Sequence, residues 1–282
     1  MCQREQGIKW YNNNMNKRVK ILLIIAIVAA IVVVGFAVMA VGFSYKPTSG
    51  EIGERFIVSN PLQLSQVEAL SQYRSCAGHD FRGPTVTGKM ESSPRSLKHY
   101  VKVREDFRGT VDKVAALAPF DGVVSVIESD LGRPGDQQIW LTPNSKSPRQ
   151  WHFIFFHVNL DPGLKEGSPV FAGELIGTAN LARGPEVPSN LEGPEGITDN
   201  FDIAVKFTRP LHRPIFETPF YHMAEDVLAE YAKHGINAEN MVIPEETRDN
   251  NPCPLLPEGE GFGGPDVYFP PEASQDAYIF LK

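Results

Sequence analysis

The chain has 282 residues, of which 42% are hydrophobic and 22% charged, and its formal net charge is −7. This composition is that of a folded protein and excludes an intrinsically disordered one. The 24 glycines and 23 prolines favour a turn-rich β fold over a helical bundle.

An apolar run without any charged side chain occupies residues 21–43. As a helix it would extend about 34 Å, enough to cross a bilayer core of about 30 Å. The alternative is a cleaved signal peptide, whose apolar core is usually only about 7 to 15 residues long. The length of the run therefore favours a retained transmembrane helix.

The flank before this run predicts its orientation. Residues 1–20 carry five basic side chains against one acidic side chain, which places them in the cytoplasm by the positive-inside rule. We therefore expect a single-pass protein of the cell membrane with an extracytoplasmic C-terminal domain. That exported part keeps 22 of the 27 basic and 33 of the 34 acidic residues, a net charge of −11. Such acidity argues against nucleic-acid binding, which needs a basic patch. The five basic residues are Arg4, Lys9, Lys17, Arg18 and Lys20.

The cysteines separate by compartment. Cys2 is expected in the cytoplasm, whereas Cys76 and Cys253 are expected outside, where disulfides persist. This pairing favours a Cys76–Cys253 bridge, and the alternative is two independent buried thiols.

After a linker over residues 44–55, the spacing of apolar residues from 65 to 73 predicts a short helix. The adjacent His79 and Asp80 stand between glycines, in a tight loop or at a strand edge. Residues 97–103 alternate apolar with polar and predict a strand that contains His99.

The pattern of short strands between Gly, Pro and Asp turns is densest over residues 120–207, which we expect to be the core of the fold. A long loop is predicted over 182–199. The predicted strands are 123–127, 139–142, 151–158, 168–171, 174–178 and 201–207.

The last part of the chain changes character. Thr218 can cap a helix that has Pro219 at its first position and ends at Gly235. Residues 244–282 are acidic, irregular and rich in Pro and Gly, and their aromatic residues predict that they pack over the core. The expected organisation is thus an extracytoplasmic β domain over 56–216, followed by a C-terminal helix and a wrapping tail over 217–282.

No phosphate-binding Gly-rich loop, nucleophile elbow, zincin helix or zinc-spaced cysteine pair occurs. His79 and Asp80 could bind a metal, or be a loop histidine and a turn-capping aspartate. His99 could serve as a ligand, or be a strand histidine bonded to its neighbours. His157 ends a very apolar strand and must be hydrogen-bonded or functional. The remaining histidines are predicted to be structural or on the surface, namely His152, His212, His222 and His234.

The core contains DGVV at 121–124, two phenylalanines before His157, and LDPGLKEGSPVFAGELIGT at 160–178. Together these phrases resemble the lysostaphin-like zinc endopeptidases, β domains of the duplicated-hybrid-motif type that cut peptidoglycan cross-bridges. The resemblance covers residues 120–207 and implies a sandwich or barrel-like β domain with His157 as the catalytic histidine. Biotinyl and lipoyl carriers share a similar hairpin, but the chain lacks their modified lysine between small or Met residues.

The closing strand departs from the family pattern. Where the family has His-x-His, the chain has Asn200 and Asp202, so one catalytic histidine and one zinc ligand are replaced. Either a zinc site is rebuilt from His79 or His99 with Asp80 and Asp202, or the site has decayed and the domain binds or scaffolds. The second alternative leads us to expect a cell-envelope module whose partner is an envelope polymer or an envelope protein. The first predicts a zinc-dependent endopeptidase that acts on peptidoglycan or another envelope polymer.

Overall fold

The computed structural model describes residues 16–42, 46–129, 135–144, 150–182, 199–257, 268–270, 272–273 and 277–282. The chain divides into two compact units, Met1–Ser44 and Tyr45–Lys282. The predicted loop over 182–199 and the N-terminal flank lie largely outside the described residues, and so does Cys2.

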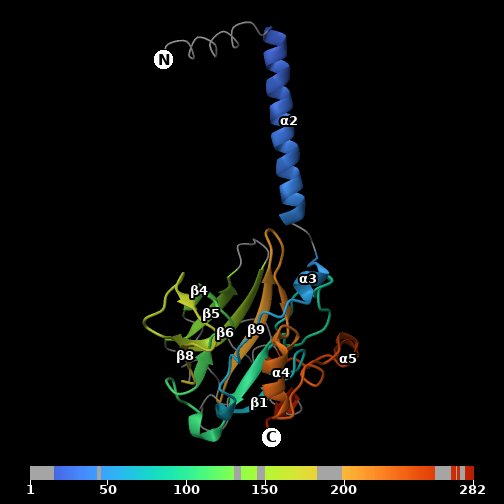
Figure 1. Ribbon diagram of the computed structural model, residues 1–282. Coiled ribbons are helices and arrows are strands. Elements are labelled where there is room, and N and C mark those ends of the chain that lie inside the picture. Colours follow the sequence, from blue (N-terminus) through green and yellow to red (C-terminus); the bar gives the residue numbers. More distant parts are fainter. Residues whose placement is uncertain are drawn as a thin grey trace. The chain divides into compact units, whose positions relative to one another are not determined.

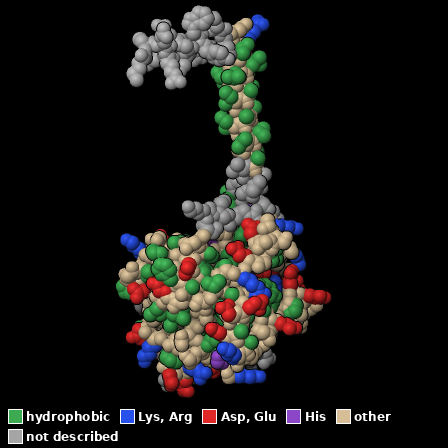
Figure 2. Space-filling model, in the orientation of Figure 1, with side chains coloured by type: hydrophobic (Ala, Val, Ile, Leu, Met, Phe, Trp, Pro, Cys, Tyr) green, Lys and Arg blue, Asp and Glu red, His purple; other side chains and the backbone are tan. Residues whose placement is uncertain are grey.

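The first unit contains one long helix, α2 (Lys17–Gly42), of 26 residues. Its described large apolar side chains, from Val19 to Phe36, are exposed, and Figure 2 shows one face of them. It is long and apolar enough to cross a membrane, and a signal sequence near an N-terminus has the same properties. The predicted apolar helix is therefore confirmed, whereas its orientation stays a prediction.

The second unit is built on one antiparallel sheet, so the expectation of a mainly β domain is confirmed (Figure 1). The main path runs β11-β1-β2-β9-β6-β5-β4-β7, with β10 paired to β9 and β8 paired to both β3 and β6. The strands are β1 (Val67–Ser71), β2 (His99–Val103), β3 (Ala115–Leu117), β4 (Gly122–Ser129), β5 (Gln137–Pro143), β6 (Gln150–Leu160), β7 (Pro169–Val170), β8 (Leu175–Ala179), β9 (Asn200–Thr208), β10 (Ile215–Glu217) and β11 (Tyr278–Phe280).

The α-helices described in this unit are short, namely α3 (Ser49–Ile52), α4 (Glu225–Ala232) and α5 (Glu245–Asn250). Short 3-10 turns include those at Leu64–Gln66, Glu105–Phe107 and Pro219–Tyr221.

The helix predicted over 65–73 is wrong, because a 3-10 turn is followed there by strand β1. Four of the five β1 residues are buried, since the strand lies between β2 and β11 and is covered on both faces. A strand covered on both faces loses the alternation of apolar and polar residues that would identify it.

The predicted C-terminal helix is broken in two. Thr218 caps a 3-10 turn by accepting a hydrogen bond from the Phe220 N–H at 3.3 Å, and α4 begins only at Glu225. Between them, the carbonyl of His222 accepts from Ile57 N–H, and Ala224 N–H donates to the Ile57 carbonyl. The His222 carbonyl and the Ala224 N–H are therefore bonded to Ile57 and are not available for the hydrogen bonds of a continuous helix.

Strand alternation gives the central strands two different faces. The inner face carries His99, Val101, Phe155 and Ile203, of which the three apolar residues belong to the main core. The outer face carries Lys98, Tyr100, Phe156 and Asp202. A smaller apolar cluster covers this outer face, formed by Tyr73, Leu97, Ile154, Phe156, Ala204 and Phe216 with Phe81, Trp140 and Val242 packed against it.

Residues 75–96, which we call the covering segment, supply Phe81 to this cluster. The Phe81 ring lies 4.7 Å from that of Phe216 and 6.2 Å from that of Phe156. The covering segment is tied to the C-terminal part by a Cys76–Cys253 disulfide, with Cα atoms 5.4 Å apart. The predicted bridge is thereby confirmed.

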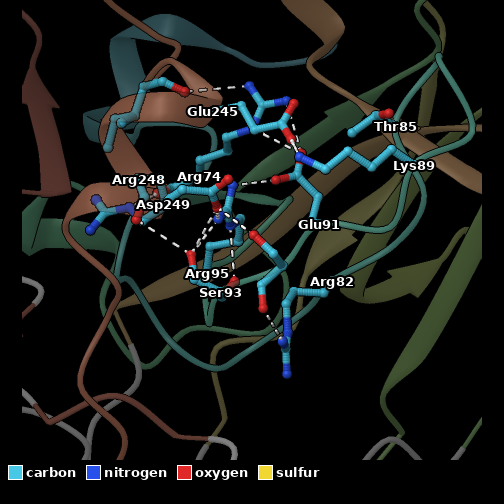
Figure 3. A network of polar contacts seen from close by, with 12 residues as sticks. Arg74, Arg82, Thr85, Lys89, Glu91, Ser93, Arg95, Glu245, Arg248 and Asp249 are labelled. Carbon is cyan, nitrogen blue, oxygen red and sulfur yellow. Dashed lines mark hydrogen bonds and ion pairs between the residues drawn. The ribbon is translucent and has the colours of Figure 1, made fainter.

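A network of charges adds to this tie (Figure 3). The guanidinium of Arg95 is fully buried and contacts Glu91, Ser93 and Asp249. Arg74 pairs with the same Glu91 at 2.9 Å. The covering segment is therefore joined to α5 by the ion pairs Arg95–Asp249 and Lys89–Glu245, and to the residues that follow α5 by the disulfide.

Candidate functional site

A buried ammonium lies at the centre of the outer face. Register places Tyr100 of β2 opposite Asp202 of β9, so Lys98, just before β2, reaches the same place. Lys98 Nζ donates to Asp202 Oδ2 at 2.9 Å and lies 3.4 Å from His79 Nε2. Its side chain is only 5% exposed.

Two aromatic rings complete the surroundings of this ammonium. Lys98 Nζ lies 3.8 Å from the ring centre of Phe156 and 4.6 Å from that of Phe81. A cation gains electrostatic stabilisation over an aromatic face, most of all where water is excluded. The carboxylate of Asp202 and the two ring faces therefore all attract the positive charge of Lys98.

The protonation states follow from the contacts. His79 Nδ1 lies 3.2 Å from the Asp80 carbonyl oxygen and must donate to it, so Nε2 presents its lone pair to Lys98. Burial, and then the charge of Lys98, lowers the pKa of His79 to about 4. Burial alone would raise the pKa of Asp202, but Lys98 and then His157 bring it below its usual value. The cluster thus holds an ammonium, a carboxylate and a neutral imidazole.

His157 lies beside this cluster at a bend in β6. The strand pairs with β9 up to Phe156 and with β8 from Val158, so His157 is the residue at which the partner changes. Its backbone is left-handed, with φ 59°, a conformation that few non-glycine residues adopt. Such a bend redirects the side chain.

A buried carboxylate holds the imidazole of His157. Its Nδ1 lies 2.6 Å from Asp136 Oδ2, the Asp136 side chain is fully buried, and that of His157 is 22% exposed. The second oxygen of Asp136 is buried without a described hydrogen-bond partner, as is Asp202 Oδ1. An imidazole oriented by a carboxylate is the arrangement used by general bases.

The four predicted metal-site residues are not all brought together. His79 and Asp202 meet around Lys98. Asp80 accepts instead from Arg95 N–H at 3.1 Å and from Arg82 Nε at 2.9 Å. The prediction of a zinc site built from them remains a prediction.

His99 faces the opposite side of the sheet. Its Nδ1 lies 2.6 Å from the Ser71 carbonyl oxygen and its Nε2 lies 2.8 Å from Thr218 Oγ1. Burial lowers the pKa of this fully enclosed imidazole to about 4. Both ring nitrogens are therefore used in hydrogen bonds within the fold, as in the structural alternative considered for this residue.

The donor set does not fit a zinc ion as it stands. Zinc takes imidazole nitrogens and carboxylate oxygens at about 2 Å. Here the ammonium of Lys98 takes one donor of each kind. Among the residues described, no group of three or more His, Cys, Asp or Glu side chains is arranged to hold a metal ion.

Sequence reasoning missed Lys98 and Asp136. In the predicted strand, Lys98 and Tyr100 lie on one face and His99 lies on the other. That Lys98 meets Asp202, however, follows only from the register between β2 and β9. No local signal marks Asp136, which stands just before β5. By contrast, His152 and His222 are structural as expected. His152 contacts Thr142 and Thr208, whereas His222 contacts Glu217 and the Glu54 carbonyl oxygen.

No protein-family model, no curated protein and no solved structure matches this chain.

Proposed function

We propose that residues 56–216 form an extracytoplasmic binding or assembly module of the cell envelope, with a lysostaphin-like duplicated-hybrid-motif fold and without metal catalysis. The observation that carries the proposal is the position of Lys98. Its ammonium lies between Asp202 and His79, two residues of the predicted zinc site.

An ammonium group in the position expected for a zinc ion has a chemical consequence. A catalytic zinc ion polarises a carbonyl group and lowers the pKa of its bound water to about 7. An ammonium has no open coordination position and cannot bind and ionise water in this way. With Asn200 also in the place of a family histidine, the module lacks the groups for metal-assisted hydrolysis and keeps the partly exposed edge at His157 for binding.

The charge of the module limits its partners. The part of the chain after residue 20 has a net charge of −11, and on the face seen in Figure 2 acidic and basic side chains are interspersed. A nucleic acid would need a concentrated basic surface. We therefore propose an envelope polymer or an envelope protein as the partner, with α2 as the membrane anchor and residues 1–20 in the cytoplasm.

One observation favours an alternative, a zinc-dependent endopeptidase that acts on an envelope polymer. His157, the residue that matches the family's catalytic histidine, is partly exposed and oriented by buried Asp136. A decayed site has no need of such an orientation. This alternative requires Lys98 to leave its position.

Sedimentation with purified peptidoglycan sacculi tests the proposal. We expect the detergent-solubilised full chain, supplied with zinc, to sediment with the sacculi and to release no soluble fragments. His157→Ala, which changes the exposed edge of the site, should weaken this retention. Lys165→Ala, on an exposed turn, serves as the control and should not. Absence of retention would overturn polymer binding, and release of fragments would establish the endopeptidase instead.

A further inference from the structure

The Cys76–Cys253 disulfide has a cation at one of its two sulfurs. Arg248 Nη1 donates to Cys76 Sγ at 3.1 Å. The same guanidinium donates from Nε to the Arg74 carbonyl at 2.7 Å and from Nη1 to the Asn251 carbonyl at 2.8 Å. The guanidinium is therefore fixed against Cys76 by the backbone on both sides.

The contact is chemically asymmetric. Burial and the charge of Arg95 lower the pKa of Arg248, but an arginine in a protein stays protonated. A neighbouring arginine lowers the pKa of a cysteine thiol and stabilises its thiolate. Arg248 therefore favours Cys76 over Cys253 as the sulfur that leaves when the bond is opened.

The two sulfurs also differ in the backbone that carries them. Cys76 belongs to the covering segment, close to the paired residues Ser75 and Ser96. Cys253 lies in residues 251–257, which form no helix or strand. Both are buried, with 7% and 3% of their surface exposed, so an attacking thiol needs a local displacement.

Displacing Cys253 costs the hydrogen bond from its N–H to the Pro94 carbonyl at 3.2 Å. Displacing Cys76 disturbs two shorter bonds next to it, from Arg74 N–H to the Ser96 carbonyl at 2.8 Å and from Ser96 N–H to the Ser75 carbonyl at 2.9 Å. The irregular stretch around Cys253 therefore supplies the displacement with less loss of backbone pairing.

We propose that Cys76–Cys253 is a thiol–disulfide exchange site that is reduced by a protein dithiol in one direction. A thiolate of the reductant attacks Cys253 Sγ, and a mixed disulfide forms as the original S–S bond breaks. Cys76 leaves as a thiolate paired with Arg248. The second thiol of the reductant then displaces Cys253, so the reductant is oxidised to its own disulfide and the chain gains two electrons and two protons.

Reduction of the disulfide would loosen the covering segment, which lies over Lys98 on the outer face of the sheet. The covering segment carries His79 and Phe81, both of which lie against Lys98 or its aromatic neighbours. After reduction, the covering segment loses its covalent tie and keeps ion pairs, such as those of Arg95 and Glu91, and backbone hydrogen bonds, such as that from Phe269 N–H to the Gly78 carbonyl. Exchange at this disulfide therefore regulates access to the outer face.

Kinetics of reduction test the role of Arg248. Dithiothreitol should reduce the full chain in detergent about three- to tenfold more slowly after Arg248→Gln than in the wild type, because the leaving thiolate loses its cation. Arg248→Lys, which keeps the charge, should recover part of the rate. The matched control is Lys89→Gln. It also removes a cation near α5, but this cation pairs with Glu245 and not with a sulfur, so the rate should not change. Equal rates in folded wild type and Arg248→Gln would overturn the proposal.

The direction of attack gives a second test that needs no variant. Brief exposure to reduced glutathione, acid quenching and peptide mass spectrometry should locate the mixed disulfide on Cys253. A mixed disulfide on Cys76 would overturn the proposal even if Arg248→Gln failed to fold. Hydrogen exchange of residues 75–96 should rise upon reduction of the wild type, and no rise would overturn the regulation of access.

Discussion

Replacing Asp202 with alanine should lower the free energy of unfolding of the second unit by about 3–5 kcal/mol, the cost of leaving a buried charge without its partner. Lys98 and Asp202 are 5% and 2% exposed, so water cannot take over the lost interaction. The neutral His79 nitrogen, 3.4 Å away, is a weaker partner than a carboxylate. The ammonium must then lose its proton or draw in water, and either change destabilises the fold.

Urea denaturation of the variant measures this effect. The double variant Lys98→Met with Asp202→Leu removes both charges, and it should be much closer to the wild type than Asp202→Ala. Glu68→Ala removes the partner of Arg108, at 2.8 Å, from a pair whose side chains are about one third exposed, and it should cost about 1 kcal/mol or less. If Asp202→Ala cost no more than Glu68→Ala, the buried Lys98–Asp202 pair would not be important for the stability of the fold.

Replacing Arg95 with methionine should lower the free energy of unfolding by about 3 kcal/mol. This is the lower end of the range of about 3–5 kcal/mol for breaking a buried ion pair. Glu91 is 1% exposed and keeps Arg74 as its partner at 2.9 Å, which reduces the loss. Asp249 is more exposed and can be hydrated in part. The effect should be local, because the network joins the covering segment to α5 (Figure 3).

Denaturation together with hydrogen exchange tests this prediction. Exchange should rise in residues 75–96 and 245–250 before it rises in β6 and β9. Lys89→Met breaks an exposed pair between the same two elements, 62% and 32% exposed, and should change stability by less than about 1 kcal/mol. A uniform rise across the sheet would contradict a local role for Arg95.

The strands of the core were predictable from the sequence, because Gly, Pro and Asp turns separate short apolar segments from 122 to 208. β1 was not, because burial on both faces removes its alternation. The break between Pro219–Tyr221 and α4 depends on pairing with residue 57, more than 160 positions earlier. β6 and β9 are also buried on both faces, but their aromatic and β-branched residues mark them as strands. β1 (VEALS) has only one such residue, and its strand conformation depends on pairing with β2 and β11.

The candidate site was predictable only in part. His79, His157 and Asp202 stood out as polar residues in apolar or glycine-flanked surroundings. Alternation along the predicted strand could have shown that His99 points away from Lys98. The meeting of Lys98 with Asp202 depends on the register of two strands about 100 residues apart, which local sequence does not specify.

The zinc content of the full chain tests most directly whether Lys98 has taken the place of a metal. The protein would be purified in detergent, incubated with excess zinc, dialysed and analysed by mass spectrometry of the metal. We expect far less than one zinc ion per chain, and the same for Asp202→Ala. One zinc ion per wild-type chain, lost in Asp202→Ala or His79→Ala, would contradict the proposed replacement of the metal by an ammonium.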